Sequence, residues 1–201
     1  MAFTAAQVWG DLDRASNAVT SEASALREIV LLSNSLAPDE AAKMRALVSR
    51  HIETAVREEW PAMAKGRATL AIQPVALSEA LPETLGFAAS DDTQLIQREL
   101  MGAIEKALEA RRQRIVISQS TIDGGKWFGL VVTGLCVLIG IALVHADNQT
   151  NCAIATSLFA TGMAVSLLLI ASHSHPFTGE ITVSSELLQQ VARQIGSNLH
   201  P

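Results

Sequence analysis

Charge is scarce along one part of this 201-residue sequence. Between Trp127 and Ala171 the only formally charged residue is Asp147, whereas the stretch before Ser120 carries most of the charge. A soluble core helix does not need about twenty residues that are apolar all round, but a helix that crosses a bilayer does. We therefore predict an integral membrane protein whose segments at about 126–146 and 151–172 form a two-helix transmembrane hairpin.

Cysteine is rare as well. Cys136 lies near the middle of the first predicted span, and Cys152 lies at the outer end of the second. At about 1.5 Å of rise per residue their depths differ by roughly 10 Å or more, which is too far for a disulfide bond. Both cysteines are interpreted as small apolar residues, and no metal-binding or thiol-redox spacing occurs.

Several functions lack the residues that they would need. A net charge of −5 argues against nucleic-acid binding, for which a basic face is expected. The sequence has no nucleophile elbow, phosphate-binding loop or zinc-protease motif. His173 and His175 have no third ligand nearby, and residues 1–6 lack the basic start of a signal peptide. We expect no enzyme, catalytic residue, cofactor, metal site or nucleic-acid partner.

Residues 1–120 are predicted to form a cytoplasmic helical region with helices at about 4–36, 39–64 and 91–118. In the first helix apolar residues recur three and four positions apart, although Glu22 interrupts this seam. Pro61 is expected to end or kink the second helix, which should pair antiparallel with the first. The region between 67 and 90 is predicted to be an irregular connection with a short helical piece. The fold class is thus all-α, a bundle of long helices plus the transmembrane hairpin.

The hairpin is assigned to residues 121–175, and residues 124–126 (Gly-Gly-Lys) should break the helical pattern before it. Residues 176–201 are predicted to be a cytoplasmic C-terminal tail with a short extended piece at 180–183. An amphipathic helix should follow, capped by Ser184 or Ser185. One side of this helix is expected to carry Leu187, Leu188, Val191 and Ile195.

Basic residues flank only one side of the predicted hairpin, and a membrane boundary accounts for their position. The loop between the spans has no Lys or Arg. The positive-inside rule therefore places the N- and C-termini in the cytoplasm, in an inner or plasma membrane. The basic residues that precede the first span are Lys106, Arg111, Arg112, Arg114 and Lys126.

Each predicted span also carries a stripe of small residues. Such stripes let membrane helices approach closely, so they are expected to join the two spans or to contact a neighbouring subunit. A general richness of membrane helices in Gly and Ala would explain them as well. The first stripe comprises Gly125, Gly129, Thr133, Cys136 and Gly140, and the second comprises Ala153, Ser157, Ala160, Ala164 and Ala171.

The second predicted helix holds the polar residues that come nearest to a chemical site. Glu53, Glu58 and Glu59 share it with His51. A carboxylate–histidine site would need a pocket, so a solvated face is the default interpretation. The pair Trp60–Pro61 is interpreted as a packing unit at a helix end.

Three stretches of this sequence resemble the bestrophin-like domain family. They are residues 19–26 around Glu22, residues 59–63 (Glu-Trp-Pro-Ala-Met), and residues 175–181 just past the last span. Together with the basic run at 110–114, the resemblance covers most of residues 9–185. The positions that it singles out are Glu22, Glu59, Trp60, Pro61, Arg111, Pro176, Phe177 and Gly179.

The resemblance implies a remote likeness to bestrophins, pentameric anion channels with cytoplasmic helical domains. It therefore implies a homo-oligomeric, channel-related protein in a lipid bilayer, with small anions as partners. Family members usually carry further upstream spans, and residues 2–9 resemble the tail of one, so a truncated reading frame is expected. Ser174 stands where the family commonly has an acidic residue. The alternative hypothesis is a membrane-anchored interaction module that uses the apolar seam from Val8 to Ile29 and has no transport activity.

Overall fold

The computed structural model describes residues 2–87, 91–119, 124–173, 177 and 183–197, and within them it contains helices and no strand. The expected all-α fold is confirmed. In chain order the elements are α1 (Ala2–Ser33), α2 (Pro38–Thr54), the π-helical turn η1 (Ala55–Glu59), α3 (Trp60–Ala64), α4 (Val75–Leu85), α5 (Asp91–Gln119), α6 (Gly124–Val144), α7 (Gln149–His173) and α8 (Glu186–Ser197).

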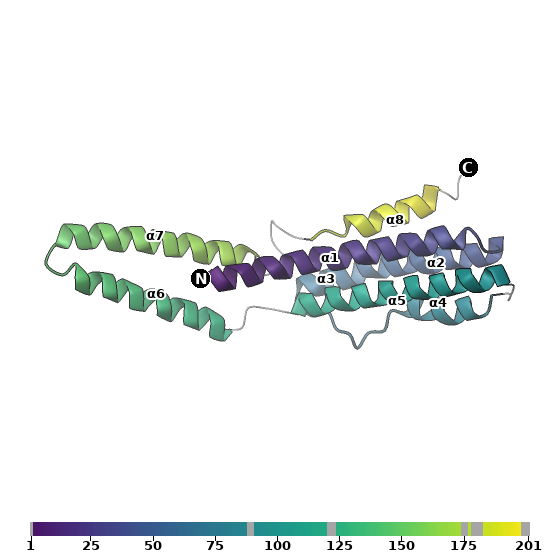
Figure 1. Cartoon of the computed structure of the whole chain (residues 1–201), viewed down its shortest axis with the longest axis horizontal. Helices are drawn as coiled ribbons and strands as arrows, with labels where there is room; N and C mark the ends of the chain where they lie inside the picture. The colour runs from purple at the N-terminus through teal and green to yellow at the C-terminus, as the bar shows by residue number, and fades with distance from the viewer. Residues whose placement is uncertain (1, 88–90, 120–123, 174–176, 178–182, 198–201) are drawn as a thin grey trace.

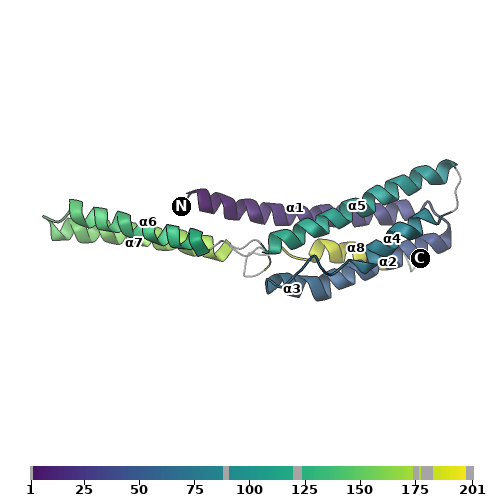
Figure 2. The same ribbon diagram turned by 90° about the horizontal axis from the view of Figure 1, so that it is seen from below.

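The helices form two parts, a bundle and a projecting hairpin (Figure 1). The bundle contains α1 to α5 and α8, and its most extensive contact joins α1 to α5. Helices α6 and α7 lie side by side beyond one end of the bundle (Figure 2). The start of α1 reaches the base of this hairpin, where α1 contacts α7. The predicted pairing of α1 with α2 is also observed.

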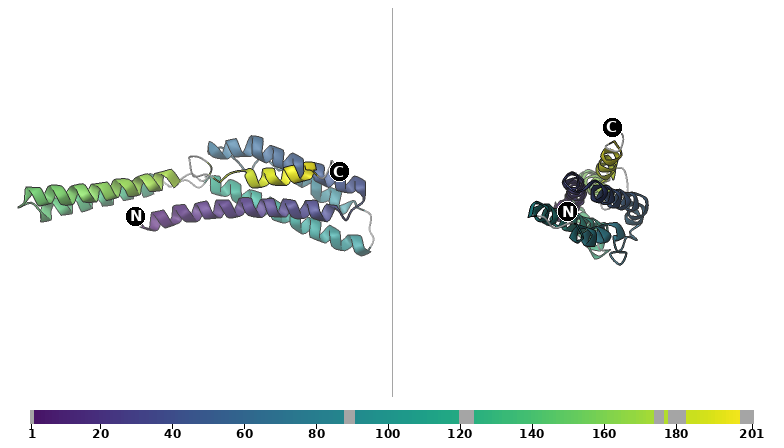
Figure 3. Two further views of the ribbon diagram at one scale, coloured as in Figure 1. Left: turned by 90° about the horizontal axis from the view of Figure 1, so that it is seen from above. Right: turned by 90° about the vertical axis from the view of Figure 1, so that its right-hand side faces the viewer.

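The bundle core results from the apolar spacing of its helices. This core is built by α1, α2, α4, α5 and one face of α8. Viewed along its axis, the bundle has α8 packed at its edge (Figure 3). The predicted side of α8 is confirmed for its three buried residues, whereas Leu187 is 37% exposed. The largest fully buried apolar side chains are Leu26, Ile29, Met44, Leu77, Leu100, Ile104, Ile115 and Leu188.

The second predicted helix does not end at Pro61 but passes it through a π-helical turn. Proline lacks an N–H and its ring clashes with the carbonyl four residues earlier. In η1 the Trp60 N–H instead donates to the Ala55 carbonyl, five residues back. The inserted residue turns the downstream part of the helix by about 100° around its axis relative to a regular helix. This rotation decides which side chains of α3 and η1 face α5.

Helices α6 and α7 could each cross a membrane. Residues Trp127–Val144 have a mean hydropathy of 2.5 and residues Gln149–Ser172 one of 2.0. Only 11% and 6% of these segments are buried, whereas a core helix of a soluble protein would be mostly buried. The expected break at residues 124–126 is wrong, because α6 begins at Gly124. Cys136 and Cys152 are both free, as expected.

Helices α6 and α7 approach each other at Gly134, which is not one of the glycines of the predicted stripe. A Cβ atom added to Gly134 would overlap the end of the Met163 side chain, whereas one on Gly129 or Gly140 would meet nothing within 4 Å. Every residue of both predicted stripes is exposed. The expectation that the stripes join α6 to α7 is therefore wrong, and a contact with a neighbouring subunit stays a prediction.

We predict that Gly134→Leu separates α6 from α7, because the added side chain takes the space of Met163. The native cysteines, one on each helix, can carry spin labels, and electron–electron double resonance in lipid reports their distance. The distribution should broaden or move outward in the variant. Gly140→Leu is the matched control and should leave it unchanged; equal effects of both substitutions would contradict the observed contact.

Candidate functional site

A salt bridge between Glu22 of α1 and Arg114 of α5 lies inside the bundle. Both side chains are 0% exposed. The Nε atom of Arg114 donates to one Glu22 oxygen at 2.7 Å, and its Nη2 atom donates to the other at 3.1 Å. Paired contacts of this kind match the planar fork of the guanidinium to the carboxylate. Glu22 thus interrupts the apolar seam because it has a buried cation as its partner.

His51 of α2 completes the surroundings of Glu22. Its Nε2 atom lies 2.8 Å from a Glu22 oxygen, and its side chain is 3% exposed. An ionised carboxylate can only accept hydrogen bonds, so the Nε2 atom carries the proton and donates. Glu22 is therefore held from α2 and α5 at the same time.

Glu59, the last residue of η1, bridges Arg114 to a second arginine. One of its oxygens accepts from Arg114 Nη2 at 2.8 Å, and the other accepts from Arg111 Nε at 2.7 Å. Arg111 Nη2 also donates to the Ile72 carbonyl at 3.1 Å, which anchors the connection before α4. The two carboxylates and two guanidiniums balance in charge, which is the condition under which buried ions are tolerated.

Trp60 connects this cluster to the segment that comes after α7. The Arg114 guanidinium lies over the Trp60 ring, with its Cζ atom 4.7 Å from the ring centre. The Phe177 ring meets Trp60 edge-on at 5.8 Å, and Trp60 Nε1 donates to the Val183 carbonyl at 3.3 Å. Cation–π and edge-to-face contacts of this kind each contribute about 1 kcal/mol.

The cluster shifts the ionisation of its central pair. Burial, the largest influence, by itself raises the pKa of Glu22, but Arg114 and His51 together outweigh it and lower that pKa from 4.5 to about 2. Burial lowers the pKa of Arg114, but Glu22 and Glu59 outweigh it and leave that pKa raised. Both groups are charged at neutral pH.

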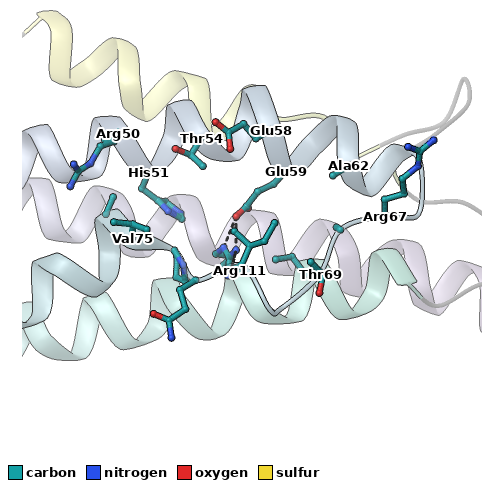
Figure 4. Close-up of a pocket in the computed structure, with 16 residues that line it drawn as sticks. Arg50, His51, Thr54, Glu58, Glu59, Ala62, Arg67, Thr69, Val75 and Arg111 are labelled. Atoms are coloured by element: carbon teal, nitrogen blue, oxygen red, sulfur yellow. Dashed lines mark hydrogen bonds and ion pairs between the residues drawn. The ribbon is translucent and has the colours of Figure 1, made fainter.

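A cavity of about 300 Å³ lies beside the cluster, between η1, α3 and the connection that leads to α4 (Figure 4). In that view His51 and Glu59 point toward the cavity, and Arg111 lies at its floor. Its wall is largely apolar, and its volume is at the small end of the range for ligand pockets, about 300 to 1,000 Å³. Among the described residues no group of His, Cys, Asp or Glu is arranged to hold a metal ion.

The structure brings together five of the eight positions that the family resemblance singled out: Glu22, Glu59, Trp60, Arg111 and Phe177. Pro61 is exposed beside Trp60 and shapes the π-turn rather than the cluster. Pro176 and Gly179, like the expected extended piece at 180–182, lie outside the described residues.

Two interpretations of the polar residues were wrong. A membrane boundary does not account for Arg111 and Arg114, which are buried in ion pairs, although it still suits the exposed Arg112. Likewise His51 and Glu59 do not belong to a solvated face, although Glu53 and Glu58 do. The sequence pattern did contain a usable signal, because a charged residue inside an apolar seam needs a buried partner.

Together these features define a helical protein whose bundle is joined by buried ion pairs and whose apolar hairpin is suited to a bilayer. The family model described as the bestrophin-like domain matches residues 1–188. The chain therefore belongs to the bestrophin-like family, and this membership indicates a channel-related kind of protein. No curated protein and no solved structure matches the chain.

We predict that Glu22→Gln lowers the free energy of unfolding at pH 7 by about 3 kcal/mol, because Arg114 loses one of its two buried counter-charges. The measurement is a denaturant titration in detergent, followed by circular dichroism. The matched control is Glu28→Gln on the same helix. Its side chain is 39% exposed and its ion pair with Lys106 spans 3.5 Å, so a change within about 0.5 kcal/mol is expected.

The natural chain and the Glu22→Gln variant together test the pH dependence of the stability. The pKa of Glu22 is lower in the folded chain, about 2 against 4.5, so its contribution is present above pH 4.5 and is lost as the pH falls toward 2. The natural chain should lose stability over that window more steeply than Glu22→Gln. Parallel acid titrations of the two proteins would contradict the assignment.

Proposed function

We propose that this chain is a subunit of an oligomeric, anion-conducting membrane channel and catalyses no reaction. The observation that carries the proposal is the match of the bestrophin-like family over residues 1–188, on a chain whose two most apolar helices stand exposed outside the bundle. The lipid bilayer is the environment that these exposed helices fit.

Conduction would require several copies of the chain, because two helices enclose no pore. The stripes of small residues on α6 and α7 support assembly, since both are exposed and neither joins the two helices to each other. The hydroxyls of Thr133, Thr161 and Ser166 donate to carbonyls of their own helices. Neither described span contains a charged residue between Trp127 and Val144 or between Gln149 and Ser172, so an apolar constriction is the kind of gate that suits this hairpin.

The alternative of an interaction module loses its main motivation. It relied on the apolar seam of α1 as a surface for a partner. The seam residues Ala15, Val19, Leu26 and Ile29 are each at most 1% exposed, and they are buried in the bundle's own core. That seam is therefore used within the chain.

The proposal is tested with purified protein in mild detergent and in planar bilayers. We expect an oligomer by light scattering and a chloride current that persists when the cation is exchanged. Gly129→Leu adds bulk to the exposed stripe and should reduce both the oligomer and the current, whereas Val137→Leu on the same helix should not. A monomer that passes no current would refute the proposal.

The proposed orientation can be tested with the two native cysteines. The loop after α6 has no Lys or Arg, whereas Lys106 and Arg112 remain exposed on the other side, so the loop should lie outside the cytoplasm. A membrane-impermeant maleimide should label Cys152 from the outer side only. Cys136, in the middle of α6, is the internal control and should stay unlabelled. Labelling of Cys152 only in inverted vesicles would reverse the assignment.

A further inference from the structure

The cavity beside the ion cluster has an apolar body and a polar floor. Ala62, Ala68, Ile72 and Ile115 contribute apolar wall, and the Glu59–Arg111 pair lies at the floor (Figure 4). The ion pairs of the cluster do not require a half-open cavity of about 300 Å³ next to them. Such a space, with a few polar groups at one end of an apolar wall, is the usual form of a small-molecule site.

The hydrogen bonds at the floor decide which ligand charge fits. Both oxygens of Glu59 already accept from guanidinium groups, so the carboxylate is engaged. Arg111 uses its Nε and Nη2 atoms on Glu59 and the Ile72 carbonyl. No described residue accepts a hydrogen bond from its Nη1 atom, and Arg111 itself lines the cavity. At the Glu59–Arg111 pair the unused hydrogen-bonding capacity is therefore that of a donor.

The rim of the cavity carries both signs of charge, and these charges are exposed. Arg50 is paired with Glu79, which neutralises it. Arg67 and Glu58 are exposed, and in Figure 4 both point away from the Glu59–Arg111 pair. Rim charges of this kind are screened by water, so the groups at the floor determine which ligand charge the cavity favours.

We propose that this cavity binds a small organic carboxylate, whose apolar part lies against the wall and whose carboxylate accepts from Arg111 Nη1. The ligand's carboxylate lies beside a guanidinium whose Nη1 donor is not used by Glu59. It is a charge-assisted contact in a partly desolvated site, where such contacts are strongest. The site does not depend on ion conduction, because the bundle builds it alone.

The test uses the full chain in lipid nanodiscs and three probes that share one ring: 4-fluorobenzoate, 4-fluorobenzyl alcohol and 4-fluorobenzylamine. Fluorine NMR titrations give the affinities, and empty nanodiscs correct for partition into lipid. The benzoate should bind at least about tenfold more tightly than the alcohol or the amine, the ratio expected of one charge-assisted hydrogen bond. Equal binding of benzoate and alcohol, or tighter binding of the amine, would overturn the proposal.

Two variants locate the binding. Ala62→Leu fills the cavity and should weaken benzoate binding by about tenfold or more, whereas Ala64→Leu on the same short helix does not line the cavity and should change it by less than about twofold. Arg111→Gln should bring the benzoate down to the affinity of the alcohol. If Arg111→Gln fails to fold, the two leucine variants still decide, since benzoate binding unaffected by Ala62→Leu places the site elsewhere and refutes the inference.

Discussion

The Glu22 carboxylate and the Arg114 guanidinium lie side by side where no water reaches them, and the bundle is arranged around that pair. One apolar cluster lies on the side of Leu26 and Ile104, and another lies on the side of Val19 and Ile115. Removing either ion would leave the other uncompensated in the interior, which commonly costs about 3 to 5 kcal/mol. The relative positions of α1 and α5, which carry Glu22 and Arg114, are therefore constrained by this ion pair.

That constraint extends to the hairpin through Trp60. The tryptophan ring packs on Arg114, and its edge contacts and hydrogen bond hold Phe177 and Val183, which come after α7 in the chain. The π-turn before Pro61 gives Glu59 and Trp60 the rotation that they need to face α5. A local backbone irregularity thus serves two purposes, since it places Glu59 in the ion cluster and places Trp60 against Phe177 and Val183.

Apolar periodicity predicted the long helices of the bundle to within a few residues, because spacing along one helix reports its own buried face. The hairpin was predicted to a similar accuracy from its lack of charge. The partners of the charged residues could not be predicted in this way. Arg111 and Arg114 stand three positions apart and share a face, but they sit before a span, where basic residues are common for another reason. Which explanation holds depends on Glu22 and Glu59, which are 92 and 55 residues away from Arg114. No local pattern contains that information.

The hairpin shows the same limit within a membrane-like helix pair. Small residues at steps of three and four mark faces that permit close approach, but a face alone does not say which neighbour it meets. Met163 packs over Gly134, whereas a Cβ atom on Gly129 or Gly140 would meet no neighbour, so this stripe faces away from α7. The apolar seam of α1 is buried in the core of the bundle, whereas the stripes of small residues on α6 and α7 remain exposed. Under the proposed function, copies of the chain therefore meet through the exposed stripes of their hairpins, because the apolar seam of α1 is already buried.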